Sequence, residues 1–231
     1  MKPNGQITTG AGLIALAVFF NLPFARLAAT FNYPDILRQP TTTILAAFTA
    51  GGPALIATWY AFALAALLFI PAGLAHAFAS NRLTTAPALA ISAALIGTLA
   101  GLLQAMGLLR WTLVVPSLAA SGDTEGFALI HAYAGLALGE HLGQLLTAFH
   151  VALIAVLQLR ERARVTPLIG AASAALITLG AMEGPALALG LNGTPYALAA
   201  IAGYLALTLW MILSGVGLLR QSTPARRPLI A

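Results

Sequence analysis

The chain has 231 residues, of which 60% are hydrophobic and 7% are charged, and its formal net charge is +5 at pH 7. A soluble domain carries roughly 25% charged residues, so this composition excludes a surface built mainly for water and indicates a protein that folds in lipid. Its 11 lysines and arginines are not clustered on one element, which excludes a nucleic-acid-binding surface, and the absence of cysteine excludes disulfides and thiolate sites.

Several stretches are apolar enough to cross a bilayer, which takes about 20 mostly apolar residues per helix. In chain order they cover residues 10–31, 52–79, 86–115, 127–159, 165–191 and 196–219. The sequence therefore predicts an all-α integral membrane bundle of six transmembrane helices, which form a single transmembrane domain over residues 1–231.

The first of these runs is the least regular. Asn21, Pro23 and Arg26 interrupt it, and we expect them to shorten or bend the helix. Lys2 followed by an apolar run also resembles a cleaved signal peptide, but Leu-Pro-Phe-Ala at residues 22–25 is a poor small-residue cleavage site. We therefore expect this run to be retained as a transmembrane helix.

The connection after the first run contains its own element. Residues 33–35 read Tyr-Pro-Asp, which is typical of a turn, and three threonines at 41–43 precede the apolar Ile44, Leu45 and Phe48. This pattern predicts a turn followed by a short amphipathic helix that lies at the membrane interface.

The charges of the connections predict an orientation. With six helices, the basic residues fall on one side of the membrane: Lys2, Arg82, Arg160, Arg162, Arg164, Arg220, Arg226 and Arg227. The polar loop at residues 117–125 falls on the other side. Positive loops mark the cytoplasm, so we expect both termini to be cytoplasmic in a bacterial inner membrane, and residues 220–231 to form a mobile basic tail.

Four charged residues lie inside the predicted spans, where an ionisable side chain costs at least a few kcal/mol. They are Arg26, Arg110, Glu140 and Glu183. At about 1.5 Å of rise per residue, all four fall in the outer half of the membrane. Because an isolated buried charge costs more than a paired one, we expect the two arginines and the two glutamates to pair with one another.

Other polar side chains share this depth. Together with the four charges they form a predicted polar cluster: Arg26, Gln104, Arg110, Glu140, His141, Gln144 and Glu183. One interpretation is a structural cluster that fixes helix packing. The other is a site that opens to the outer face and binds a polar ligand or moves protons.

The fourth run combines two patterns. At about 100° per residue, one stripe contains Tyr133, Glu140, Gln144 and Thr147. A second stripe of small residues forms a groove in which another helix can pack closely, made by Gly135, Gly139 and Gly143. Gly97 and Gly101 of the third run are a candidate mate. The groove fits a helix of this chain, a second copy or another membrane protein.

Metal and cofactor sites have little support. His141 and His150 are nine residues apart on opposite sides of a helix, and no two histidines on different helices match in depth, which argues against haem. Glu140 and His141 with a further carboxylate are a geometric option for zinc, but Ala137 and Gln144 break the zinc motif. No motif for nucleophilic catalysis or nucleotide binding occurs, so we predict no cofactor and no metal.

Four strings resemble those of an uncharacterised bacterial family of multi-pass membrane proteins, a domain-of-unknown-function family. They are FNYPDILRQPT, GGPALIATWYAFALAALLFIP, GLLQAMGLLRW and GEHLGQLLTA, and the resemblance extends from about Phe31 to Leu159. It implies a small helical inner-membrane protein without an established activity, and it supplies no catalytic residues. It suggests the positions to test first: Asp35, Trp59, Arg110, Trp111, Glu140, His141 and Gln144.

Three classes of function follow from these observations. The leading hypothesis is a non-enzymatic scaffold, sensor or accessory subunit, whose partners are the lipid bilayer and a second copy or membrane protein at the glycine groove. The second is a small transporter or channel that uses the outer polar cluster and helices broken at Pro23, Pro71 and residues 184–185. The third, which depends only on Glu140 and His141, is an intramembrane metal-dependent enzyme.

Overall fold

The apolar runs fold as helices, because in lipid every backbone N–H and C=O group must find a partner within its own segment. The computed structural model describes residues 3–222, and 6 of its helical stretches are long and apolar enough to cross a membrane. No strand occurs among these residues. The predicted all-α membrane bundle is confirmed, whereas Lys2, Arg226 and Arg227 of the predicted basic ends lie outside the described residues.

The helical elements follow one another through short connections. In chain order they are α1 (Pro3–Phe31), η1 (Asp35–Arg38), α2 (Thr41–Ala77), η2 (Ala79–Asn81), α3 (Arg82–Thr85), α4 (Pro87–Leu113), α5 (Val115–Ser121), α6 (Thr124–Ile130), η3 (His131–Gly143), α7 (Gln144–Arg160), α8 (Val165–Gly180), α9 (Glu183–Ala188) and α10 (Thr194–Ser222). The stretches that can cross a membrane are α1, α2, α4 with α5, α6 with η3 and α7, α8 with α9, and α10.

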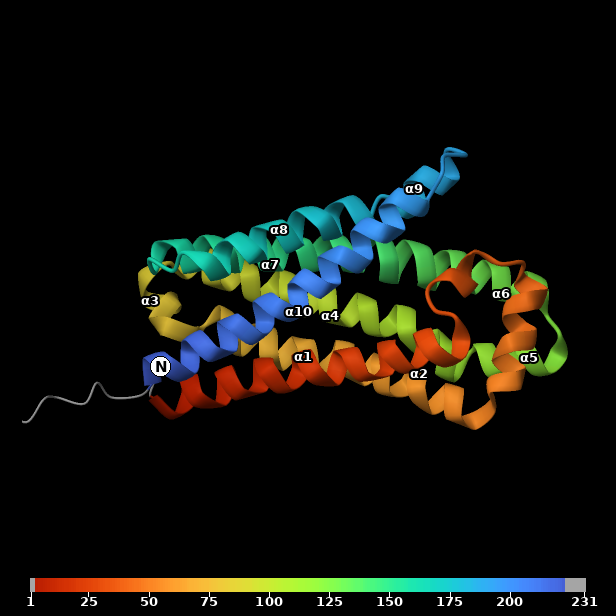
Figure 1. Cartoon of the computed structure of the whole chain (residues 1–231), viewed down its shortest axis with the longest axis horizontal. Coiled ribbons are helices and arrows are strands. Elements are labelled where there is room, and N and C mark those ends of the chain that lie inside the picture. The colour runs from red at the N-terminus through yellow and green to blue at the C-terminus, as the bar shows by residue number, and fades with distance from the viewer. Residues whose placement is uncertain (1–2, 223–231) are drawn as a thin grey trace, which may run out of the picture.

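The second stretch begins at Thr41 rather than at the predicted residue 52, because a short helix leads into it through a bend. Gly52 has φ 56° and ψ −155°, a region that only glycine adopts readily. Residues 41–51 therefore form a separate first leg of α2 (Figure 1). Ile44, Leu45 and Phe48 of this leg are buried, and they anchor the short helix that the sequence predicts.

Two further segments differ from the sequence prediction. α1 is one continuous helix in spite of Pro23, and Asn21 donates a hydrogen bond of 2.9 Å to Thr208 Oγ1 of α10. The predicted polar loop is helical up to Ser121, and the chain reverses at Gly122 with φ 68°. Asp123 then caps α6 by accepting a 2.8 Å hydrogen bond from the Gly126 N–H.

The six stretches form a closed ring in chain order. α1 packs against α2, α2 against α4, α4 against η3 and α7, α7 against α8, α8 against α10, and α10 against α1 (Figure 1). Both α1 and α10 have their free ends at one end of this ring, which we call the terminal end. A ring of this size encloses an interior, and side chains from all sides must fill it.

The ring closes at a tight crossing of α1 and α10 near the terminal end. A Cβ atom built on Gly10 would lie 2.7 Å from the Gly215 carbonyl oxygen, and one built on Gly215 would lie 2.5 Å from the Gly10 carbonyl oxygen. Only residues without a Cβ allow this approach. From this crossing the two helices diverge toward the other end of the ring (Figure 1).

We expect Gly10→Val to lower the free energy of unfolding by about 2 kcal/mol, because the added side chain meets backbone that cannot rotate away. Gly12→Val is the matched control, since a Cβ there meets nothing within 4 Å, and its effect should stay within about 0.5 kcal/mol. Unfolding by sodium dodecyl sulfate in maltoside micelles, followed by circular dichroism, measures both. Equal effects of the two variants would show that the crossing is not tight.

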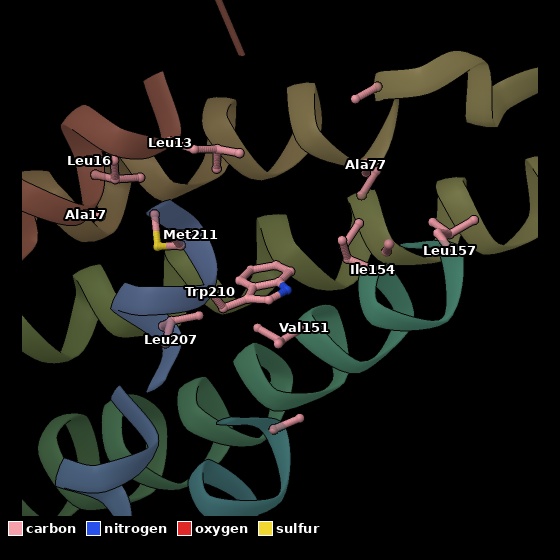
Figure 2. Close-up of a cluster of buried hydrophobic side chains, with 14 of the residues drawn as sticks. Leu13, Leu16, Ala17, Ala77, Val151, Ile154, Leu157, Leu207, Trp210 and Met211 are labelled. Atoms are coloured by element: carbon pink, nitrogen blue, oxygen red, sulfur yellow. The ribbon is translucent and has the colours of Figure 1, made fainter. Parts of the chain in front are cut away.

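The terminal half of the ring is filled by a packed hydrophobic core. Trp210 lies at its centre, surrounded by Leu13, Met211, Ile154 and Leu157 (Figure 2). The Trp210 indole N–H donates a 3.1 Å hydrogen bond to Gln158 Oε1, and the Gln158 amide donates 2.9 Å to Ser214 Oγ. This core leaves the polar groups of Trp210 and Gln158 satisfied and closes the ring toward the terminal end.

At the terminal end itself, the connections carry the basic residues. Arg160, Arg162, Arg164 and Arg220 are exposed there. Arg82 is instead 2% exposed, and it donates two hydrogen bonds of 2.6 and 2.9 Å to the Glu161 carboxylate. This pair joins the connection between the second and third stretches to the connection between the fourth and fifth.

Candidate functional site

A cavity lies inside the ring, in the half away from the chain termini. Its volume is about 530 Å³, within the range of roughly 300–1,000 Å³ that is typical of sites for small organic molecules. Every membrane-crossing stretch contributes to its wall, and so does the connection between α1 and α2.

Most of the wall is apolar. Besides two tyrosines, its aromatic residues are Phe20, Phe24, Trp59, Phe62 and Trp111. Trp59 and Trp111 are fully buried, and their rings stack with centroids 4.8 Å apart and planes 8° apart. Such a wall suits the apolar part of a ligand.

Arg110 is the buried cation of this wall, and it is 5% exposed. Its guanidinium donates to the Gly107 carbonyl, lies 3.3 Å from His131 Nδ1 and sits 5.1 Å above the centre of the Trp111 ring. Gly135 makes room for it, because a Cβ there would lie 2.6 Å from Arg110 Nη2. Among the residues that the structure describes, no carboxylate pairs with Arg110 directly, and its Nε–H has no acceptor.

Glu140 and Gln144 lie on the same wall, four residues apart. Across residues 3–222, Glu140 has neither a hydrogen bond nor an ion pair, although its charge interacts with that of Arg110. The buried Gln144 Oε1 also lacks a donor within the described part of the chain. The cavity thus contains hydrogen-bonding groups that the protein itself leaves unpaired.

All the residues of the fourth stretch that line the cavity, except Gln144, come from a π-helix. η3 has i→i+5 hydrogen bonds and therefore more residues per turn than the α-helix assumed above. His131, Gly135, Leu136, Gly139 and Glu140 line the cavity, whereas Tyr133 is 61% exposed. The predicted stripe is therefore wrong for Tyr133, because the wider turns rotate it away from Glu140.

The connection between α1 and α2 crosses the cavity, and we call residues 33–38 the strap. Tyr33, Pro34, Leu37 and Arg38 line the cavity. Arg38 holds the strap to α9 by donating hydrogen bonds of 2.9 and 2.5 Å to Glu183 Oε1. Burial, with the nearby Glu140 as a second cause, raises the pKa of Tyr33 above its ordinary value, so its hydroxyl remains protonated.

This pairing differs from the one that the sequence predicts. Glu183 pairs with Arg38 of the strap, not with Arg26 or Arg110. Arg26 donates a 3.1 Å hydrogen bond to Thr58 Oγ1 and is exposed, outside the cavity wall. The prediction failed because residues of the connection were placed outside the membrane, whereas the strap folds back over the interior of the ring.

The other members of the predicted cluster also divide into residues that line the cavity and residues that lie outside it. Gln104 lines the cavity, and its amide donates to Thr147 Oγ1 at 2.5 Å and to the Tyr204 hydroxyl at 3.1 Å. His141 lies outside the wall and donates a 2.7 Å hydrogen bond to the Ala181 carbonyl. The structure thus brings five of the seven predicted residues to one cavity: Gln104, Arg110, Glu140, Gln144 and Glu183.

The glycines of the predicted groove pack within the chain. Gly139 contacts Gly107 of α4, and Gly143 lies against Gln104. Gly97 and Gly101, the predicted mates, have other neighbours: a Cβ on Gly97 would meet the His150 ring, and one on Gly101 would meet Ile70 of α2. The groove is therefore occupied by α4, but at a register about two turns from the predicted one.

The histidines are arranged differently from the prediction. The His150 ring lies against Gly73, about one turn from His76, so these two histidines of different helices do match in depth. Both rings have structural contacts: His150 donates 2.8 Å to the Ala93 carbonyl, and the His76 ring packs 5.2 Å from Trp210. Over residues 3–222, no three His, Asp or Glu side chains are placed to hold a metal ion.

The cavity reaches the surface of the bundle near α9 and α10. Five of its lining residues there are exposed: Leu187, Leu191, Asn192, Thr194 and Leu205. Leu205 is 60% exposed and points to the face that lipid covers in a membrane. The cavity wall therefore includes residues of the outer surface in the half of the ring away from the packed terminal core.

Several residues of the cavity wall were not identified from the sequence. Tyr33 was assigned to a turn, and Arg38 and Tyr204 were not singled out. The sequence alone could not assign His131 to the cavity wall, because the direction of its side chain depends on the π-helix.

Comparison with known families gives one match. The family described as Domain of unknown function (DUF4386) matches residues 8–215. The comparisons with curated proteins and with solved structures give no match.

Proposed function

Since the chain belongs to the family described as Domain of unknown function (DUF4386), we propose its function from the cavity: the protein binds a small amphipathic molecule within the membrane, as the substrate-binding step of a transporter. The observation that carries this proposal is a cavity of about 530 Å³ with a mainly apolar wall and unpaired polar groups. A protein that serves only as a scaffold has no need of such a space, because close packing stabilises a bundle better.

The packed terminal core favours a carrier over a channel. Trp210 and its neighbours fill the ring on the terminal side of the cavity. An open channel needs a continuous path, whereas a carrier exposes its site to one side at a time. The strap, held by the Arg38–Glu183 pair, lines the cavity where a carrier would need a closure that opens.

Two other hypotheses from the sequence are weaker. A sensor would use the same binding step, so only a transport measurement separates it from a carrier. The hypothesis of a metal-dependent enzyme loses its support, because His141 lies outside the cavity and donates its hydrogen bond to the Ala181 carbonyl.

From the exposed arginines at the terminal end, we infer that this end faces the cytoplasm of an inner membrane and that the cavity opens to the outer side.

Filling the cavity tests the proposal. We expect Leu136→Trp to weaken binding at least tenfold, because Leu136 lines the cavity and the indole would occupy it. The probes are four tritiated twelve-carbon amphiphiles that differ in head group: dodecanol, dodecanoate, dodecylammonium and 2-aminododecanoate. Equilibrium dialysis against protein in nanodiscs, with empty nanodiscs subtracted, measures a saturable component for at least one of them.

Leu142→Trp is the matched control, since Leu142 is on the same π-helix, is 42% exposed and does not line the cavity. It should bind like the unmodified protein. The absence of saturable binding for all four probes, or equal binding by Leu136→Trp, contradicts the proposal. Uptake of a bound probe into proteoliposomes then distinguishes a carrier from a sensor.

A further inference from the structure

We propose that the cavity holds a head-group site with two poles, and that its ligand is an amphipathic zwitterion whose oxyanion faces Arg110 and whose ammonium faces Glu140. This inference rests on the proposed function that the cavity binds an amphipathic molecule. It adds the chemical class of that molecule.

The first pole consists of hydrogen-bond donors. Three buried N–H groups lack an acceptor in the described part of the chain: Arg110 Nε, Trp59 Nε1 and Trp111 Nε1. They belong to adjoining side chains, because the two indoles stack at 4.8 Å and the Arg110 guanidinium lies 5.1 Å from the Trp111 ring centre. Buried donors are almost always paired in proteins. All three belong to side chains that line the cavity, and they therefore favour a ligand that brings acceptor oxygens to this part of the wall.

The second pole consists of acceptors. Glu140 has no hydrogen bond or ion pair with residues 3–222, and the buried Gln144 Oε1 has no donor there. Gly135 touches the Arg110 guanidinium, and Glu140 follows it by five residues in the π-helix, which is the i→i+5 spacing of one turn. Glu140 of the second pole thus lies about one turn along η3 from the glycine that contacts the first pole.

The charges of the wall select between the classes of ligand. Arg38 and Glu183 form a direct pair and neutralise each other. The Arg110 guanidinium and the Glu140 carboxyl group have no direct ion-pair partner among the described residues and remain in a mainly apolar space. A ligand with a single charge would leave that space with a net charge, which is costly at low dielectric, whereas a zwitterion keeps it neutral and gives each charge a partner.

The apolar wall accommodates the rest of the ligand. Phe20, Phe24 and Leu205 line the cavity, and Leu205 is also exposed on the face that lipid covers. An acyl or alkyl chain can extend along these residues. Two sources have this chemistry: a membrane lipid with an ethanolamine-type head group, and a free amino acid with a long apolar side chain.

Head-group preference in the unmodified protein is the first test. We expect 2-aminododecanoate or dodecanoyl lysophosphatidylethanolamine to bind at least tenfold more tightly than dodecanoate and dodecylammonium, measured in nanodiscs as above. Tighter binding of the lysolipid supports the zwitterion and assigns it to lipid, and tighter binding of the amino acid supports the zwitterion and assigns it to a free compound. Binding of dodecanoate or dodecylammonium as tight as that of both zwitterions overturns the inference.

The second test removes one pole. A residue with a purely structural role would affect all probes alike, and its loss would not abolish the preference for zwitterions. Glu140→Gln should abolish the preference for zwitterions and bring dodecanoate to within threefold of them. Gln144→Leu, a second variant at the same pole, should weaken both zwitterions and leave dodecanoate unchanged. Arg110→Lys keeps the charge and should retain the preference for zwitterions at reduced affinity.

The controls carry the same substitutions outside the cavity. Glu125→Gln removes an exposed carboxylate of α6, and Arg26→Lys alters an arginine that does not line the cavity. Both should behave like the unmodified protein. An equal loss for all probes in Glu140→Gln overturns the two-pole site, yet saturable binding that Leu136→Trp abolishes would still uphold the proposed function.

Discussion

Replacing Trp210 by alanine is expected to lower the free energy of unfolding by about 3 kcal/mol. Trp210 is 1% exposed at the centre of the terminal core (Figure 2). In lipid the hydrophobic effect contributes little between helices, so the cost comes from lost dispersion contacts and the space left behind. This argument places the expected value at the lower end of the range measured in soluble proteins.

Trp210→Phe separates packing from hydrogen bonding. It keeps an aromatic ring in the core but removes the indole N–H that donates to Gln158 Oε1 at 3.1 Å, for an expected loss of about 1 kcal/mol. Unfolding by sodium dodecyl sulfate in maltoside micelles, followed by circular dichroism, is the measurement. A change below 1 kcal/mol for Trp210→Ala would mean that the core relaxes around the deletion and does not close the ring rigidly.

Glu161→Gln is expected to cost about 3 kcal/mol as well, for an electrostatic reason. Arg82 is 2% exposed, and both of its bonds to a charged acceptor go to Glu161. The Glu161 side chain is 26% exposed, but removing its charge leaves a buried guanidinium that has lost its water and its counter-ion. The same unfolding assay measures the effect.

Glu125→Gln is the control for this variant, because Glu125 is exposed and forms no ion pair with the residues that the structure describes. Its effect should stay within about 0.5 kcal/mol. Replacing both members of the pair, with Arg82→Met and Glu161→Leu, should restore much of the lost stability, since two apolar groups need no partner. Additive losses in the double variant would argue against the buried-pair explanation.

The fold was predictable because it depends on composition. Runs of about 20 apolar residues specify helices in lipid, and the six runs of the sequence correspond to the six stretches that can cross a membrane. The short helix before Gly52 was also predictable, since three threonines precede an apolar pattern. What composition cannot give is the neighbour of each helix, and so the ring appeared only in the structure.

The candidate site was predictable only in part, and three residues explain why. Glu140 and Gln144 were found because polar groups inside apolar runs are conspicuous. Arg38 was missed, because its place depends on the strap folding over the ring. Tyr133 was misplaced, since the sequence gives no sign that residues 131–143 form a π-helix instead of an α-helix.

The closed ring has a consequence for how the helices assemble in the membrane. The α1–α10 crossing joins Gly10 to Gly215, so the two stretches that close the ring are the farthest apart in sequence of the six. α10 contributes Ala197, Ile201 and Leu205 to the cavity wall, so the wall is complete only when α10 has packed against α1 and α8. The contact that closes the ring therefore also completes the candidate site.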